Sequence, residues 1–185
     1  LGYIDEAMEY FRFVEHTMHP RGYMHHKYQP DGGLGSSWHP MVQDGRPELN
    51  IQEDETASTV ILFFELSKMC QDKDYLEDVF NSLISKMLDF MTQYIDNRTG
   101  LPYPSYDLWE EKFLTTTYTS ILVAKALELG ANSAYDNPSK QNWSEVARNI
   151  RANISKLFAS DVQYFSKGIK LEPGGEYVKD NAMDI

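Results

Sequence analysis

The sequence predicts an all-α protein built from stacked helical hairpins. Five segments carry apolar residues at helical spacing, and the connections between them alternate between short and long. Few segments alternate apolar and polar residues as strands do. With 185 residues, 42% of them hydrophobic, the chain can form one domain with a sizeable core. No fixed repeat period is visible, which argues against a solenoid of identical repeats.

The first predicted helix is followed by a long stretch without periodicity. The helix ends before His19-Pro20, because proline disfavours helix in the residue before it. Residues 21–50 are rich in Gly, Pro and His, and a structureless stretch of about 30 residues is often functional. We predict a long irregular loop or a short β-hairpin there, with strand-like alternation at 23–28 and turns at 31–33 and 44–45.

Two long helices are predicted next, over about 54–70 and 75–95. The second shows the clearest apolar spacing of i, i+3, i+4 and i+7 in the chain, so we predict that it forms core. A turn over 96–102 ends it. Cys70 is the single cysteine, so it cannot form an internal disulfide, and we predict that it is a buried small hydrophobe.

The last third combines two further helices with a less regular end. A helix over about 118–129 is followed by a glycine, and an amphipathic helix spans about 143–158. Tyr164-Phe165 is a possible strand, and the Pro-Gly-Gly run at 173–175 indicates a loop. Residues 180–185 are predicted to stop without any closing element.

The charge balance narrows the choice of partners. The chain has 28 acidic and 17 basic residues and a formal net charge of −11. This balance argues against a nucleic-acid partner and fits a neutral or cationic ligand. No apolar run approaches the roughly 18 residues that a membrane span needs, so we expect no membrane partner. The five histidines lack standard metal-ligand spacing, so we expect no metal site and mostly surface or hydrogen-bonded imidazoles.

The run Pro-Ser-Tyr-Asp-Leu-Trp-Glu-Glu at 104–111 concentrates reactive groups in a loop between helices. Three carboxylates and two aromatic rings fall within six residues. A carboxylate that holds or gives up a proton needs a partly apolar neighbourhood to set its pKa. A sugar needs a flat aromatic face for its C–H side and carboxylates for its hydroxyls. On composition alone, however, the favoured interpretation is an exposed acidic loop with one anchoring Trp.

Two earlier motifs leave alternatives open. In the run Gly-Ser-Ser-Trp-His-Pro at 35–40, Trp38 either stacks on a ligand or plugs a loop onto the core. The run Gln-Glu-Asp-Glu-Thr at 52–56 leads into a helix, where negative charge meets the positive end of the dipole. Helix capping alone explains this acidic run, and it is favoured over carboxylates that point into a site beside the loop.

Taken together, the three motifs resemble one family, the glucoamylases of glycoside hydrolase family 15, in its prokaryotic branch. Their order and spacing match, and the resemblance runs over most of residues 1–179. The resemblance implies an (α/α)6 barrel whose inner helices point their N-terminal ends toward a funnel-shaped pocket. It also implies inverting hydrolysis of α-glucosidic bonds from a non-reducing end.

The resemblance also implies a role for each residue of the third motif. Glu110 resembles the general acid, and Glu111 resembles the neighbouring carboxylate that binds glucose hydroxyls. Charge from Glu111 and Asp107, and burial against Trp109, are expected to raise the pKa of Glu110. The substrate-binding residues that the resemblance implies are Glu111, Trp109, Asp107, Trp38 and Asp54.

The general base is expected to lie outside this chain. Inverting catalysis needs acid and base carboxyls about 6.5–9.5 Å apart, and no run after Glu111 matches the base motif of the family. The early Arg-Asp substrate-binding segment of the family is also missing. We therefore interpret residues 1–185 as a single partial domain, the central part of the barrel, without an upstream β-sandwich or the downstream half of the barrel. The chain starts with Leu and shows no signal peptide, and we expect a cytoplasmic location.

The resemblance implies a glucan 1,4-α-glucosidase-like enzyme that acts on α-glucan oligosaccharides without a cofactor. One alternative is a trehalase of the same family, which would act on trehalose. An alternative of another class is a non-catalytic helical module that binds carbohydrate or protein. The chain alone is expected to be inactive and to self-associate through exposed apolar helix faces.

Overall fold

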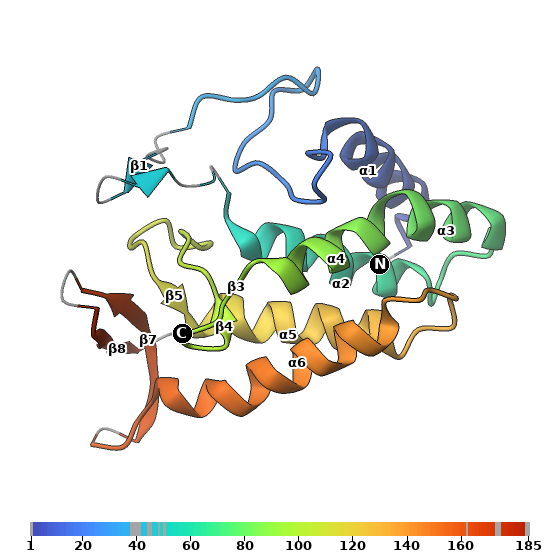
Figure 1. Ribbon diagram of the computed structural model, residues 1–185. Coiled ribbons are helices and arrows are strands. Elements are labelled where there is room, and N and C mark those ends of the chain that lie inside the picture. Colours follow the sequence, from blue (N-terminus) through green and yellow to red (C-terminus); the bar gives the residue numbers. More distant parts are fainter. Residues whose placement is uncertain are drawn as a thin grey trace.

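The structure is a computed structural model (Figure 1) that describes residues 2–37, 42–43, 46–47, 49, 51–161, 163–172 and 175–183. Five helical rods run through these residues, as the apolar spacing predicts. They are α1 (Ile4–Thr17), α2 (Glu53–Leu66), the continuous rod of α3 (Lys73–Val79), a π-helical turn (Phe80–Ile84) and α4 (Ser85–Gln93), α5 (Thr117–Ala131) and α6 (Lys140–Ile154).

The described strands are short except for one hairpin near the C-terminal end. They are β1 (Val42–Gln43), β2 (Arg46–Pro47), β3 (Ile95–Asp96), β4 (Leu101–Pro102), β5 (Thr115–Thr116), β6 (Phe158–Ala159), β7 (Tyr164–Leu171) and β8 (Tyr177–Met183). The predicted helix over about 143–158 is therefore too long, because a 3-10 turn at Ser155–Leu157 leads into β6.

Helices α2 and α5 form an inner pair that lies side by side. Both begin on the same side of the molecule, where β5 also lies (Figure 1). Both helices are apolar on nearly all sides, which is typical of helices that are covered all round. In α2, Val60 and Phe63 face the core, whereas Leu62 is exposed; Ile121 is exposed on α5.

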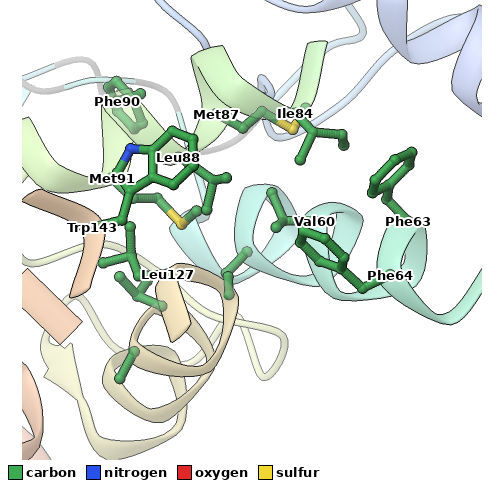
Figure 2. Close-up of a cluster of buried hydrophobic side chains, with 14 of the residues drawn as sticks. Val60, Phe63, Phe64, Ile84, Met87, Leu88, Phe90, Met91, Leu127 and Trp143 are labelled. Carbon is green, nitrogen blue, oxygen red and sulfur yellow. The ribbon is translucent and has the colours of Figure 1, made fainter. Parts of the chain in front are cut away.

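Helices α4 and α6 cover one face of this pair with amphipathic surfaces. Figure 2 shows side chains of α2, α4, α5 and α6 meeting in one cluster. Trp143 is fully buried there, and its indole N–H donates to the Oδ1 atom of Asp89 at 2.8 Å. This bond satisfies the one polar atom of a large buried ring. Cys70 is buried and has no disulfide, as predicted.

The predicted strand at Tyr164-Phe165 is the start of β7, but the sequence interpretation missed the rest of β7 and its pairing with β8. Residues 180–183 do not stop without a closing element: they lie in β8, which pairs with β7 in an antiparallel register that places Gly168 opposite Asp180. On its other side β7 pairs with β5 and β6. Thr116 is opposite Gly168, and a Cβ at this glycine would lie 2.5 Å from the carbonyl oxygen of Thr115. Glycine is therefore required where β5 approaches β7.

The described residues between α1 and α2 are mostly irregular, as predicted. A turn at 29–33 closes with Gln29 N–H donating to Gly33 O at 2.7 Å, and β1–β2 is the short hairpin. The strand-like alternation at 23–28 was misleading, because only Tyr28 joins a bridge, to Leu34. The predicted turn at 44–45 lies outside the described residues.

Gly22 fixes the path of this segment over the helices. Its φ is +93°, and a Cβ there would lie 2.2 Å from the carbonyl oxygen of Lys86. We predict that Gly22→Ala lowers the free energy of unfolding of the 185-residue chain by at least about 2 kcal/mol in urea titrations. Gly175→Ala is the control, because it shares a φ of +84° without a close neighbour. It should cost only about 1 kcal/mol. Equal losses would show that the contact with Lys86 contributes nothing.

The exposed apolar face of the inner pair predicts self-association of the 185-residue chain. Leu62 lines one groove together with Tyr118, which lies one turn before Ile121. In analytical ultracentrifugation the chain should sediment as oligomers, and Leu62→Lys with Ile121→Lys should shift it toward monomer. Val42→Lys with Val178→Lys replaces two exposed valines elsewhere and should leave the distribution unchanged. A wild-type chain that stays monomeric at high concentration would contradict the prediction.

Candidate active site

The loop that carries the acidic motif is closed at its base by two backbone hydrogen bonds between one pair of residues. Ser105 N–H donates to Leu114 O at 3.0 Å, and Leu114 N–H donates back at 3.2 Å. Next to this pair, Tyr106 forms a parallel bridge with Gln52, the residue before α2. The acidic motif at 104–111 and the acidic run at 52–56 are therefore brought together, as a joint site requires.

Two aspartates hold the backbone of the turn at 107–110. The Oδ2 atom of Asp54 accepts a hydrogen bond from Leu108 N–H at 3.0 Å, and the Oδ1 atom of Asp107 accepts one from Trp109 N–H at 3.0 Å. Asp107 O also accepts a bond from Glu110 N–H at 2.8 Å. An Asp side chain that binds the backbone two residues later stabilises a turn of this kind. The two aspartates thus fix the backbone position from which the Glu110 side chain extends.

Glu110 has a left-handed backbone with φ of +50°, which is uncommon for a residue with a side chain. Such strain often marks functional positions. The side chain is 43% exposed, and its Oε1 atom contacts His26 Nε2 at 2.8 Å and Gln52 Nε2 at 3.1 Å. The Oε1 atom of Glu110 is therefore anchored while the side chain reaches the surface.

The carboxyl groups at the start of α2 are buried rather than solvated. Glu53, Asp54 and Asp107 are almost fully buried. Among the described residues, no group donates to either carboxyl oxygen of Glu53, to Asp54 Oδ1 or to Asp107 Oδ2. Burial of the Glu53 carboxyl group, with neither oxygen bound by a described residue, favours its protonated form.

Burial raises the pKa values of the carboxyl groups in the first turn of α2 toward or above neutral pH. Burial, with the charge of Asp107 second, raises the pKa of Asp54 to about 7. Burial, followed by the charges of Asp54 and Glu110, raises the pKa of Glu55 to about 8. Burial also raises the pKa of Glu53 well above its ordinary value. Carboxyl groups that stay protonated near neutrality can donate hydrogen bonds as well as accept them.

The preference for helix capping at 52–56 was wrong. Gln52 occupies the N-cap position of α2 but makes no capping bond with its side chain. Its amide reaches Glu110 instead, and Asp54 reaches Leu108. The alternative interpretation, in which this acidic run faces the loop, describes the geometry. The capping pattern misled because an acidic first turn looks the same whichever way its side chains point.

Trp109 and Glu111 both lie near Lys167 of β7. The Nζ atom of Lys167 lies 3.1 Å from Glu111 Oε2 and 5.9 Å from the centre of the Trp109 ring. The Trp109 ring is half exposed, as is the Glu110 side chain, so the expected burial of Glu110 against Trp109 was wrong. Contacts of Glu110 with His26 and Gln52 replace it.

A groove of about 480 Å³ adjoins the turn and is lined by aromatic and carboxyl groups. Leu108 and Asp54 contribute from the turn and α2, and His26 contributes from the segment before α2. Its lining includes Tyr10, Phe13, Met24, His25, His26, Tyr28, Asp54, Glu55, Leu62, Leu108 and Tyr118. Aromatic faces next to carboxyl groups suit a ligand with both C–H and hydroxyl surfaces. Trp38 lies outside the described residues.

Four residues of this site received no individual role from the sequence. They are His26, Gln52, Glu55 and Lys167. Gln52 and Glu55 lie in the acidic run, so proximity to Asp54 was a usable signal. His26 and Lys167 lie in stretches without a motif of their own. Within the described residues no group of three or more His, Cys, Asp or Glu could hold a metal ion, and no helix could cross a membrane.

Stacked helical hairpins with a carboxyl-rich turn at the N-terminal ends of the inner helices α2 and α5 define a partial helical toroid. The chain belongs to the family described as Glycosyl hydrolases family 15, whose sequence model matches residues 1–181. The hairpins α2–α4 and α5–α6 are part of the (α/α)6 barrel of that family. Glucoamylase 1 of Rhizopus oryzae is 32% identical over 140 residues, which cover 72% of this chain. The chain spans about a fifth (21%) of the length of that relative.

Protonation of Asp54 should make stability depend on pH. Its pKa is 3.8 in the unfolded chain and about 7 when folded, so the folded state binds the proton more tightly. This group alone should therefore lower the free energy of unfolding by about 2–4 kcal/mol between pH 4 and pH 7.5, and Glu53 and Glu55 should add to the fall. We predict that Asp54→Asn removes the share of Asp54 in urea titrations across that range, while the share of Glu53 and Glu55 remains.

Asp161→Asn is the matched control, because Asp161 is exposed and should leave the pH profile unchanged. An Asp54→Asn profile parallel to that of the wild type would contradict the raised pKa of Asp54.

Proposed function

We propose that the protein is an inverting, exo-acting α-glucosidase of the glucoamylase type, which releases glucose from the non-reducing ends of α-glucans. The observation that carries this proposal is the anchoring of Glu110. It is the carboxyl group of the acidic motif that combines a strained backbone, a fixed oxygen and access to the surface. A general acid needs these properties, because its proton must reach a bound substrate in a defined direction.

In this proposal Glu110 donates a proton to the glycosidic oxygen as the bond from the anomeric carbon breaks. Glu111 and Asp54 bind sugar hydroxyls, and Asp107 holds the turn on which the acid sits. Trp109 offers a half-exposed ring to the C–H face of the sugar. Trp38 is proposed as a further wall of the pocket, on the resemblance of its motif alone.

The proposal places the general base outside residues 1–185. That carboxylate removes a proton from water on the opposite face of the sugar ring, about 6.5–9.5 Å from the acid. The activity therefore belongs to the full-length protein. Membership of the family supports a carbohydrate substrate, and the similarity to a glucoamylase favours α-glucans over trehalose.

We predict that Glu110→Gln in the full-length protein lowers the rate of glucose release from maltose about 100- to 10,000-fold. Maltose binding, measured by calorimetry on the same variant, should persist, because the amide keeps the shape of the side chain. Glu176→Gln is the matched control: this glutamate is exposed in the β7–β8 turn and should leave the rate unchanged. Retained turnover in Glu110→Gln would overturn the acid assignment.

The same assay decides the substrate. Glucose release from maltose and longer α-glucans supports the glucoamylase type. Release from trehalose alone would replace this proposal with a trehalase. Sugar binding without release from either would indicate a non-catalytic carbohydrate-binding module.

A further inference from the structure

The imidazole of His26 is held between a hydroxyl and the proposed acid. Its Nδ1 atom lies 2.8 Å from Ser37 Oγ, and its Nε2 atom lies 2.8 Å from Glu110 Oε1. The His26 side chain is only 8% exposed. A buried imidazole with both nitrogens engaged has a fixed orientation, since rotation would break two hydrogen bonds at once.

The segment around His26 is folded so that Ser37 lies beside it. Tyr28 bridges to Leu34, and Gly35 N–H donates to Lys27 O at 2.9 Å. A Cβ at Gly35 would lie 2.7 Å from the Cγ atom of Lys27, so this close approach depends on glycine. The pairing of residues 27–28 with residues 34–35 therefore places the Ser37 hydroxyl next to the Nδ1 atom of His26, on the opposite side of the ring from Glu110.

We propose that His26 is a positioning residue that orients the proton of Glu110 toward the substrate. This inference rests on the proposed function, in which Glu110 is the general acid. His26 fixes the Oε1 atom as the oxygen that accepts hydrogen bonds, so that the acidic proton resides on Oε2. It also stabilises the carboxylate that remains after the proton has left.

The donors around Oε1 determine this arrangement. An amide nitrogen can only donate, so Gln52 Nε2 gives one hydrogen bond to Oε1. The Ser37 hydroxyl can donate to Nδ1 of a neutral imidazole, which then carries its proton on Nε2 and donates it to the same Oε1. When the Glu110 carboxyl group is protonated, as the general acid must be, two N–H groups pointing at Oε1 make this atom the carbonyl oxygen. The hydroxyl of the acid is thus assigned to Oε2.

The chemical step follows from this assignment. The proton on Oε2 passes to the glycosidic oxygen while the bond from that oxygen to the anomeric carbon breaks, and the bonding electrons stay on the oxygen. Water attacks the anomeric carbon from the opposite face and gives its proton to the base outside this chain. Glu110 becomes a carboxylate, and hydrogen bonds to a charged acceptor are stronger than those to a neutral one. His26 therefore contributes more after proton transfer than before it.

Other carboxyl, imidazole and ammonium groups line the groove beside the pair, together with the phenol groups of Tyr10, Tyr28 and Tyr118. Asp54 and Glu55 reach the same groove from α2, and His25 and Lys27 reach it from the segment of His26 itself. Burial raises the pKa values of Asp54 and Glu55 to about 7 and about 8. At neutral pH the Glu55 carboxyl group is therefore mostly protonated and the Asp54 carboxyl group about half protonated.

The test compares His26→Leu with His26→Gln in the full-length protein. Leucine cannot donate to Oε1, whereas glutamine can place an amide N–H close to the position of the imidazole Nε2. For maltose we expect kcat to fall about 10- to 100-fold in His26→Leu with KM changed less than about threefold. His26→Gln should recover most of that loss, and His16→Leu, an exposed histidine on α1, should behave as wild type.

The decisive measurement uses α-glucosyl fluoride, whose leaving group departs with little help from an acid. His26→Leu should hydrolyse it within about threefold of the wild-type rate. An equal loss on maltose and on the fluoride, without recovery in His26→Gln, would show that His26 is only structural and overturn the inference. A wild-type rate of His26→Leu on maltose would also overturn it. Either result leaves the proposed function intact if Glu110→Gln is inactive, whereas an active Glu110→Gln overturns the proposed function itself.

Discussion

The junction between the first turn of α2 and the turn at 107–110 is the constraint on which the site depends. Asp54 accepts the N–H of Leu108, and Gln52 bridges Tyr106 in the same place. The loop comes from the connection between α4 and α5, so this junction joins two helical hairpins at their site-facing ends. Helix α2 packs against α5 in the core, and Asp54 of α2 binds the turn. The turn is therefore held in a fixed position relative to the core.

Burial of carboxyl groups at this junction opposes stability. The raised pKa values of Asp54 and Glu55 mean that the folded state disfavours their charged forms. The apolar core of α2, α4, α5 and α6 offsets this cost, and the loop gains fixed hydrogen-bond acceptors in return. In the described part of the chain, several of these buried carboxyl oxygens accept no hydrogen bond, which calls for an explanation. The sugar ligand that we propose for the groove next to Asp54 is one explanation.

The sequence analysis predicted the structural features that depend on residues close together in the sequence. Apolar spacing located all five helical rods, because helical contacts recur every three or four residues. The acidic motif was found because its groups lie within six residues. The full length of β7 and its pairing with β8 were missed because Ser166, Lys167 and Ile169 are all buried and show no alternation. The contact of His26 with Glu110 was missed because 84 residues separate them in sequence.

Contacts from two sides hold Glu110 and the residues next to it. These contacts come from irregular segments and from a β-hairpin, which explains why both are present beside a helical core. On one side His26 and Gln52 bind the acid itself. On the other, Lys167 of β7 binds Glu111, and Lys112 binds Asp180 of β8 at 2.6 Å. Two segments that lack helical periodicity therefore serve one turn. A helix end alone could not position a side chain whose backbone is left-handed, so the long segment before α2 and the β-hairpin supply the restraint.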